Sequence, residues 1–419
     1  MMTIIDLLAD AAARGARYLE TLPKRSVAPA PPAIDALRVF GQPLPERPTD
    51  PAAVLQQLDN AGSPATVATA GGRYFGFVIG GSLPAALAAN VLAAAWDQNA
   101  GLVIASPATA AIEATALRWL LEALSLPASC AAGFVTGATM ANFTCLAAAR
   151  HSLLNRAEWD VEAHGLFGAP AITVVVGDEV HVSALKALSL LGLGRDRVIR
   201  VPTDAQGRMR AELVPPLDER TILCLQAGNV NTGAFDPIAE LVDRARAARA
   251  WVHIDGAFGL WAAAAPARAA LIAGVERADS WALDAHKWLN VPYDSGVAIC
   301  RDEEALRSAM AVRAAYLVQG VEREPSAYTP ELSRRARGVE VWAALASLGR
   351  SGLAELIERN CRMATRFAAG LRDAGYEILN DVVLNQVLVS FGDDEATRRV
   401  VAGVQEDGTC WCGGTVWHG

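Results

Sequence analysis

The chain has 419 residues, of which 52% are hydrophobic and 20% charged, and its formal net charge is −8. This composition is typical of a folded enzyme and excludes a disordered, collagen-like or coiled-coil chain. The length suits two or three domains with a buried core. Because the chain carries no block of basic residues, nucleic acid and anionic membranes are poor candidates as partners.

Cysteine and lysine usage narrows the possible chemistry. Seven cysteines are scattered through mostly apolar runs, as buried free thiols are, so we expect a reducing, cytoplasmic compartment. Cys410 and Cys412 form a lone C-x-C, which predicts a strand and no metal site. Only three of the 37 basic residues are lysines (Lys24, Lys186 and Lys287), so any lysine-dependent chemistry has three candidates.

The N-terminal part predicts a helix, an arm and a second helix. The first 15 residues lack the features of a secretory signal and indicate an amphipathic helix. Residues 24–52 are rich in proline and weakly periodic, which is typical of an extended arm. The apolar run at 83–96 is shorter than the roughly 20 residues that span a bilayer, so we expect a buried helix and no membrane partner.

From residue 84 onward, short apolar runs alternate with helical stretches. The runs cover 131–135, 171–177, 197–202, 221–228, 251–255 and 296–300. Short apolar strands with helices between them predict an α/β fold, with a parallel or mixed sheet covered on both faces. Ligands of such sheets bind at the carboxyl ends of the strands, so we expect functional residues directly after these runs.

Lys287 lies in the most informative segment, ADSWALDAHKWLNVPYDSG at 278–296. An ammonium group is costly to bury, and desolvation lowers the pKa of a lysine and makes its amine nucleophilic. A lysine that extends from a loop into solvent is the alternative. The adjacent His286 and the upstream Asp255 favour the nucleophilic role.

Other polar residues follow the apolar runs, and each has a plain structural alternative. The segment GFVTGATMANF at 133–143 indicates a strand, a glycine turn and a helix start that binds phosphate, although Thr139 alone suits an N-cap. Asp255 ends an apolar run, where a carboxylate can meet a ligand or cap a helix. His181 comes directly before a predicted helix, so its structural alternative is a polar cap of that helix. Asp236 likewise comes directly before a predicted helix start.

In combination and order, these segments resemble the motifs of the group II pyridoxal-phosphate-dependent amino acid decarboxylases, from about residue 70 to the end. That family includes aromatic-L-amino-acid and glutamate decarboxylases and belongs to the aspartate-aminotransferase-like superfamily. The resemblance implies fold type I, with a mostly parallel seven-stranded sheet flanked by helices. It further implies an N-terminal helix and dimer-forming arm over 1–83, a large cofactor domain over 84–340, and a small C-terminal α+β domain over 341–419.

The resemblance assigns the cofactor contacts residue by residue. Lys287 corresponds to the lysine that forms the internal aldimine with pyridoxal 5'-phosphate, and His286 lies near the phosphate and that lysine. Asp255 corresponds to the partner of the pyridine nitrogen. Ala257 packs against the ring, and His181 stacks on it.

The phosphate contacts and the proton donor are implied in the same way. Gly137, Ala138 and Thr139 correspond to the phosphate loop, and Asn229 replaces a threonine that lies near the cofactor's 3-hydroxyl or phosphate. Tyr316 aligns with the loop tyrosine that protonates the substrate carbon, and Tyr328 is its rival. Three arginines at the start of the next helix indicate structural ion pairs, namely Arg334, Arg335 and Arg337.

The substrate pocket is implied less specifically. Tyr74, Phe77 and Asn99 lie where family members contact the substrate side chain, although Tyr74 and Phe77 also suit a core. Family members are dimers with composite active sites, so we expect a homodimer. The resemblance implies an L-amino acid substrate, with aromatic side chains as the first choice.

Two further hypotheses stay open at this point. The chain stops where the family continues into a closing helix, which leaves an expectation of a shortened homologue that binds the cofactor with impaired catalysis. An aldehyde-forming or aminotransferase relative is the other alternative. The tyrosine at 316 favours the amine product over the aldehyde, and no carboxylate-clamping arginine of the aminotransferase type is recognisable.

Overall fold

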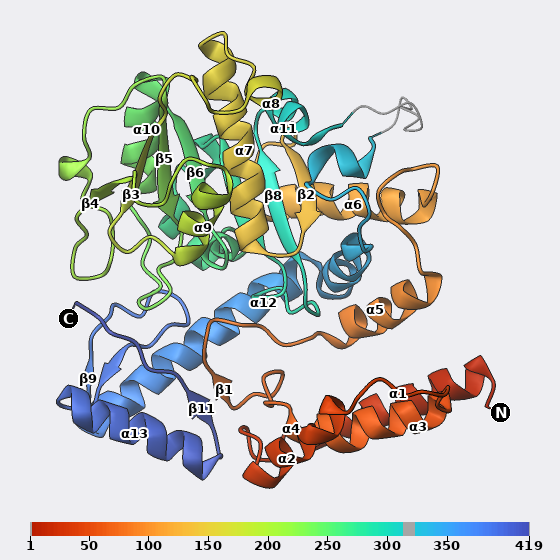
Figure 1. Cartoon of the computed structure of the whole chain (residues 1–419). Helices are drawn as coiled ribbons and strands as arrows, with labels where there is room; N and C mark the ends of the chain where they lie inside the picture. Colours follow the sequence, from red (N-terminus) through yellow and green to blue (C-terminus); the bar gives the residue numbers. More distant parts are fainter. Residues whose placement is uncertain (1, 313–322, 419) are drawn as a thin grey trace. The chain divides into compact units, whose positions relative to one another are not determined.

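A computed structural model of the chain describes residues 2–312 and 323–418 (Figure 1). The chain divides into two compact units, Met1–Gly81 with Ser390–Gly419, and Ser82–Val389. This grouping differs from the three segments expected from the sequence, because residues 390–419 fold with the N-terminal residues. Within that unit, β1 (Tyr74–Phe75) pairs in parallel with β11 (Trp411–Cys412), which confirms the strand expected at the C-x-C.

The larger unit is built on a seven-stranded sheet of order β2-β8-β7-β6-β5-β3-β4. The strands are β2 (Ala131–Val135), β3 (Thr173–Gly177), β4 (Ile199–Val201), β5 (Thr221–Gln226), β6 (Trp251–Asp255), β7 (Ser280–Asp284) and β8 (Gly296–Cys300). Strand β8 runs opposite to the other six, since it is antiparallel to both β2 and β7 while the remaining pairs are parallel. The mostly parallel α/β sheet is therefore confirmed, and β7 is the strand that the six apolar runs omitted.

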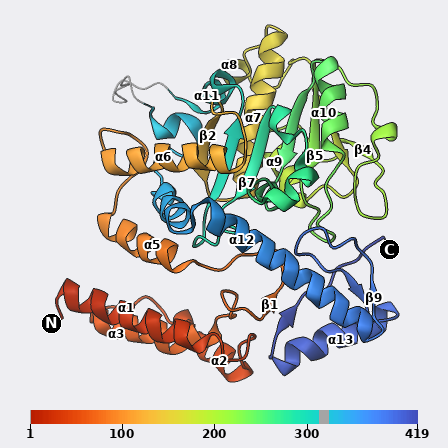
Figure 2. The ribbon, with the colours of Figure 1, turned by 180° about the vertical axis from the view of Figure 1, so that it is seen from behind.

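Helices cover both faces of this sheet. On one face, α7 (Ala138–Arg156), α9 (Val182–Leu190) and α11 (Glu303–Met310) bury leucine and alanine side chains against the strands. On the other, α10 (Ile238–Ala247) lies behind the sheet in Figure 1 and in front of it in Figure 2. The remaining α-helices of this unit are α5 (Pro84–Trp96), α6 (Pro107–Ala123), α8 (Val161–His164) and α12 (Arg337–Asp373). They are followed by the short strand β9 (Glu377–Ile378), which pairs with β10 (Val389–Ser390).

The N-terminal residues fold largely as helices. The expected first helix is α1 (Ile4–Thr21), which begins with a capping box between Thr3 and Asp6. The extended arm expected at 24–52 is wrong in part, since α2 (Pro31–Ala36) and a 3₁₀ turn over Leu37–Gly41 interrupt it. Proline begins α2 because its fixed φ suits the first helical turn. The unit also holds α3 (Pro51–Gln57), α4 (Ser63–Ala65) and α13 (Asp394–Asp407).

One apolar helix differs from its expectation. The run at 83–96 forms α5, but only Ala86 on it is buried, while Val91, Leu92 and Trp96 are exposed. An alanine-rich helix has too little side-chain volume on either face to reveal from its sequence which face is covered. Among the described residues, no helix combines the length and apolarity needed to cross a membrane. All seven cysteines are free.

Candidate active site

The predicted site residues of the larger unit gather at one edge of the sheet. Strands β3, β5, β6 and β7 are parallel, so the loops after them leave from the same edge. Strand β2 joins them because β8 is antiparallel to both of its neighbours, which pairs Gly296 with Val135 on one side and with Asp284 on the other. The sequence segments that carry Thr139, His181, Asn229, Asp255 and Lys287 therefore all begin there.

Lys287 follows β7 in a tight turn and is held within the protein. Its Nζ lies 3.0 Å from Oδ2 of Asp284, and the two side chains are 18% and 4% exposed. The same Nζ lies 6.0 Å from the ring centroid of Phe258. The lysine that the sequence places in a loop is thus paired with a buried carboxylate beside an aromatic ring and does not extend into solvent.

His286 is packed beside this lysine. Its ring lies 4.3 Å from the ring of Tyr293, and its Nδ1 accepts a hydrogen bond from the backbone N–H of Ser295. Because Nδ1 accepts, a neutral His286 carries its proton on Nε2, which lies 3.6 Å from Oδ2 of Asp284. Burial lowers the pKa of His286 and favours that neutral form.

The start of α7 reaches the same carboxylate. The N–H of Ala138 donates to Oδ1 of Asp284 over 2.6 Å. The N-cap of α7 is Gly137, without a side-chain cap, so Thr139 lies inside the first turn and the plain N-cap alternative is wrong. Glycine is required nearby, because a Cβ on Gly296 would lie 2.5 Å from the Cα of Gly137.

Asp255 ends β6 and is buried. Its Oδ1 accepts from the N–H of Ala257, and its Oδ2 accepts from Nδ2 of Asn142 over 3.0 Å. It caps no helix, since the following 3₁₀ turn has Phe258 at its N-cap. The carboxylate is therefore fixed by two donors at the carboxyl end of the sheet.

His181 is the N-cap of α9. Its Nδ1 accepts from the N–H of Ser183, whose Oγ lies 2.7 Å from the same nitrogen. Its own N–H donates to Oε1 of Gln226 at the end of β5. Lys186 lies exposed on α9, as a helix-surface lysine would.

Asn229 forms the turn after β5 and keeps one buried donor. Its Oδ1 accepts from the N–H groups of Asn231 and Thr232, and the residue is 1% exposed. Its Nδ2 has no hydrogen-bond partner among the described residues. A buried amide that lacks an acceptor is unfavourable, so this position is suited to a ligand oxygen.

The other predicted residues make contacts that are separate from those described above. Asn99 is exposed, and its Oδ1 accepts from the N–H of Arg334. Tyr74 and Phe77 belong to the unit of Met1–Gly81 and Ser390–Gly419, where both rings pack on Trp411 at centroid distances of 4.9 and 5.2 Å. Tyr316 lies outside the described residues.

The rival tyrosine has a structural role. Tyr328 is buried, and its hydroxyl donates to Oε1 of Glu303 over 2.5 Å. Burial and Glu303 raise the pKa of Tyr328 to about 12. The expected arginine ion pairs are confirmed: Arg334 binds Glu113, Arg335 binds Glu340 and Arg337 binds Asp294.

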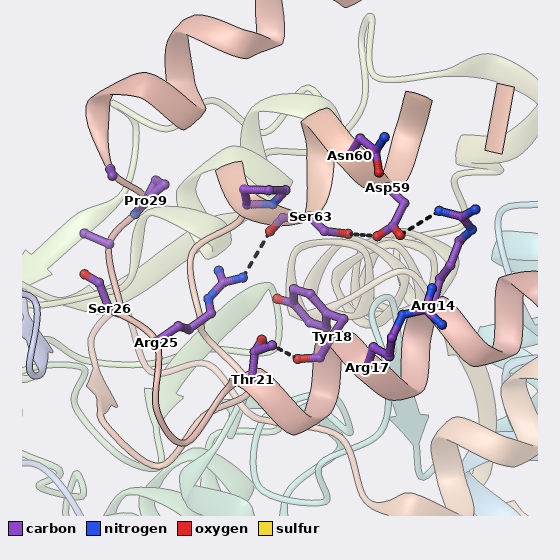
Figure 3. A pocket seen from close by; sticks show the side chains of 13 residues that line it. Arg14, Arg17, Tyr18, Thr21, Arg25, Ser26, Pro29, Asp59, Asn60 and Ser63 are labelled. Atoms are coloured by element: carbon purple, nitrogen blue, oxygen red, sulfur yellow. Dashed lines mark hydrogen bonds and ion pairs between the residues drawn. The ribbon is translucent and has the colours of Figure 1, made fainter. Parts of the chain in front are cut away.

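A cavity of about 540 Å³ lies in the smaller unit (Figure 3), and none of the predicted site residues lines it. It is lined by parts of α1 and the segments around 25–30 and 59–64. Within it, Arg14 binds Asp59, and Arg25 donates to the carbonyl of Ser63. The guanidinium groups of Arg14 and Arg25 are thus engaged in internal contacts of this unit.

Sequence reasoning missed four residues of the site. Asp284 joins Lys287 to α7, and Asn142, Ser183 and His253 connect Asp255 to the interior. The only sequence signal for Asp284 is its spacing of three residues before Lys287. Asn142 lies within the segment 133–143, but no local pattern shows that it contacts Ser183, His253 and Asp255, because those contacts join distant strands and helices.

Comparisons with known proteins identify the family. Residues 39–392 match the pyridoxal-dependent decarboxylase conserved domain. An aromatic-L-amino-acid decarboxylase of Bacillus atrophaeus is 29% identical over 344 residues, covering 79% of this chain and 69% of the relative. An L-2,4-diaminobutyrate decarboxylase of Rhizobium meliloti is 32% identical over 287 residues, covering 65% and 55%.

Solved structures show the same fold. The structure of Oryza sativa TDC with PLP and tryptamine superposes with a TM-score of 0.87 at 24% identity, covering 99% of this chain and 91% of that one. Since the domain match extends over most of the chain, it fixes the family as well as the fold. The chain belongs to the pyridoxal-dependent decarboxylase family, as a carboxy-lyase that uses pyridoxal phosphate to decarboxylate an amino acid.

Proposed function

We propose that this chain converts an aromatic L-amino acid into the corresponding amine and CO₂, with Lys287 as the residue that binds the cofactor covalently. One observation carries the proposal: a mostly buried lysine lies at the same sheet edge as a buried carboxylate, a histidine and a helix start. The names of relatives such as the Bacillus atrophaeus enzyme support the aromatic class. So does the proximity of Phe258 to Lys287.

The residues of the site fit pyridoxal phosphate. Asn229 offers a buried amide donor that has no partner among the described residues. The start of α7 offers the positive end of the helix dipole and its backbone N–H groups to a phosphate, apart from that of Ala138, which donates to Asp284 in the cofactor-free chain. Asp255 offers a fixed carboxylate acceptor to a pyridine N–H. The proposed contacts are therefore Gly137, Ala138, Thr139, Asn229 and Asp255 for these groups, with His181, Ala257, His286 and Lys287 around the ring.

When bound, pyridoxal phosphate supplies an electron sink for the pair released as CO₂ leaves the substrate's α-carbon. Asp255 keeps the proton on the pyridine nitrogen, because a buried carboxylate next to that nitrogen favours its charged form. His181 orients the ring from the start of α9. The N–H groups at the start of α7 fix the phosphate, which prevents the reacting carbon from shifting.

The last step needs a proton at the α-carbon. We assign that proton to the hydroxyl of Tyr316, as the resemblance implies, and the packing of Tyr328 against Glu303 supports the choice. A hydroxyl that donates to a buried carboxylate and has a raised pKa is a poor acid. The roles of Tyr74, Phe77 and Asn99 in the substrate pocket stay predictions.

We further propose a cytoplasmic homodimer. Five of the seven cysteines are buried free thiols, which supports a reducing compartment. Helix α1 has no buried residue, and Ile4, Ile5 and Leu8 are exposed on it, so a second copy would cover this apolar face. Light scattering tests the dimer: the double variant Ile5→Glu and Leu8→Glu should be monomeric.

The activity is tested by incubating the holoenzyme with each L-amino acid while CO₂ and product are recorded. Amine from tryptophan, tyrosine or phenylalanine supports the proposal. Aldehyde and ammonia with oxygen uptake would indicate the aldehyde-forming alternative. Cofactor absorbance without turnover on any amino acid would indicate an impaired homologue, and amine only from a non-aromatic substrate would overturn the substrate class.

A further inference from the structure

We infer that Asn142 is the branch point of a one-way hydrogen-bond chain that holds Asp255 as an acceptor and His181 with its proton on Nε2. The significance for catalysis rests on the proposed function, in which Asp255 and His181 contact the cofactor. The chain itself rests on buried contacts of the larger unit alone. Asn142 and His253 would then be positioning residues, one and two steps removed from the cofactor.

The chain begins at Trp251 and crosses the interior to α7. Nε1 of Trp251 donates to Oγ of Ser280 over 2.9 Å, and that Oγ lies 2.9 Å from Nδ1 of His253. Nε2 of His253 lies 2.8 Å from Oδ1 of Asn142, and Nδ2 of Asn142 donates to Asp255 over 3.0 Å. Trp251 is 2% exposed and Ser280, His253 and Asn142 are fully buried, so these groups must satisfy one another.

The direction of donation is set at the Trp251 end. An indole N–H only donates, so Ser280 accepts from Trp251 and gives its own proton to Nδ1 of His253. Burial lowers the pKa of His253 to about 4, so the ring is neutral near pH 7 and carries a single proton. With Nδ1 accepting, that proton is on Nε2 and is donated to Oδ1 of Asn142.

The direction is set independently at the Asp255 end. An ionised carboxylate only accepts, so the amide of Asn142 must present its Nδ2 to Asp255 and its Oδ1 to His253. The opposite orientation would place two acceptors against each other in a buried region, which is costly. Trp251 at one end and Asp255 at the other therefore give the same direction of donation along the hydrogen-bond chain, and each does so without the other.

The same amide controls a second branch. Nδ2 of Asn142 also lies 3.3 Å from Oγ of Ser183, which lies 2.7 Å from Nδ1 of His181. The backbone N–H of Ser183 donates to that Nδ1 as well, so Nδ1 of His181 holds a lone pair. Asn142 thus uses its amide protons on Asp255 and on Ser183, and the hydroxyl of Ser183 in turn contacts Nδ1 of His181.

The tautomers are tested directly in the cofactor-free, full-length chain by ¹⁵N NMR of the imidazole rings. We expect His253 and His181 each to show a protonated Nε2 and an unprotonated Nδ1. The variants His253→Gln and His181→Asn assign the two rings among the six histidines. A proton on Nδ1 of His253, or a doubly protonated ring at pH 7, would overturn the inference.

Variants of His253 test the consequence. His253→Phe keeps an aromatic ring of similar size and removes the donor to Asn142, so the Kd for pyridoxal phosphate should rise about tenfold, on the scale of one hydrogen bond to a charged group. His253→Gln keeps an N–H donor near the position of Nε2 and should stay within about threefold of the unchanged chain. Equal affinity in all three chains would overturn the inference, as would equal losses in both variants.

These results are separable from a failure of the proposed function. If borohydride reduction left Lys287 unlabelled, the proposed cofactor role would fail, while the ring spectra would still decide the direction of the chain. A normal label at Lys287 with the wrong tautomer at His253 would leave the proposed function intact and reject the hydrogen-bond chain.

Discussion

Nζ of Lys287 lies 3.0 Å from Oδ2 of Asp284, and the other oxygen of the same carboxylate accepts the first N–H of helix α7. One side chain at the end of β7 therefore joins the lysine to the helix start proposed to bind phosphate. The carboxylate compensates two positive features, an ammonium group and the N-terminal end of a helix dipole. This arrangement keeps the lysine inside the protein in the cofactor-free chain.

The Lys287–Asp284 pair should contribute measurably to stability. A double-mutant cycle of Lys287→Gln and Asp284→Asn in the cofactor-free chain should give a coupling of about 1–3 kcal/mol, because both side chains are largely removed from water. Urea unfolding of the four chains measures it. The exposed pair Arg38–Asp35 is the matched control, and its coupling should stay below about 0.5 kcal/mol. Equal couplings in the two pairs would show that Asp284 does not hold the lysine.

Covalent attachment of the cofactor should depend on Lys287 alone. Borohydride reduction of the holoenzyme followed by peptide mapping should label Lys287, and Lys287→Ala should abolish the label and reduce kcat by at least about 10³-fold, as removal of a covalent catalyst does. Lys186→Ala, an exposed lysine on α9, is the control and should behave like the unchanged chain. A label on Lys186 would reject the assignment.

Substitution of Tyr316 should change the reaction product, whereas substitution of Tyr328 should change the stability of the fold. Tyr316→Phe should lower amine formation by about 10²-fold or more and allow aldehyde to appear, because the proposed proton donor is lost. Tyr328→Phe should retain the amine product and lower the free energy of unfolding by about 1–2 kcal/mol, because it removes the hydrogen bond to Glu303. Chromatography of the products and urea unfolding measure these effects, and aldehyde from Tyr328→Phe would reverse the assignment.

The contribution of Asp236 to the free energy of unfolding should decrease as the pH rises. Burial raises the pKa of this carboxyl from 3.8 to about 6, although the N–H groups of Met209 and Gln226 donate to it. Between pH 4 and 6 the folded chain binds more protons at this site than the unfolded chain, so the site loses stabilising free energy with rising pH. The stability deficit of Asp236→Asn should thus shrink by up to about 3 kcal/mol from pH 4 to pH 7.

His253→Gln provides a control of opposite sign for that experiment. The pKa of His253 is lowered from 6.5 to about 4, so between those values the unfolded chain binds more protons at this site and stability rises with pH. The stability deficit of this variant should grow as the pH rises from 4 to 7. Urea unfolding at each pH measures both variants, and parallel pH profiles for the two would contradict the burial of one of the groups.

Local patterns in the sequence predicted most of the fold and part of the site. The six apolar runs mark six of the seven strands because fully buried strands are continuous in hydrophobicity. Strand β7 was not predicted because its residues SWALD mix polar and apolar types. Its polar residues Ser280 and Asp284 are buried because they form hydrogen bonds. The prediction that α5 is buried was wrong, because which side of an alanine-rich helix is packed against the protein depends on neighbours that are distant in sequence.

By itself, the sequence determined which residues were candidates for the site, namely Lys287, Asp255 and the glycine turn within 133–143, and their order along the chain. Each of them belongs to a local pattern that has a chemical reason. Only the tertiary structure decided that Asp284 binds Lys287 and Ala138 and that Tyr328 donates to Glu303. It also decided that hydrogen bonds connect Trp251 through Ser280, His253 and Asn142 to Asp255. These contacts join residues up to 146 positions apart. Neighbours of that kind are created by strand order and helix packing, which no local pattern of side chains encodes.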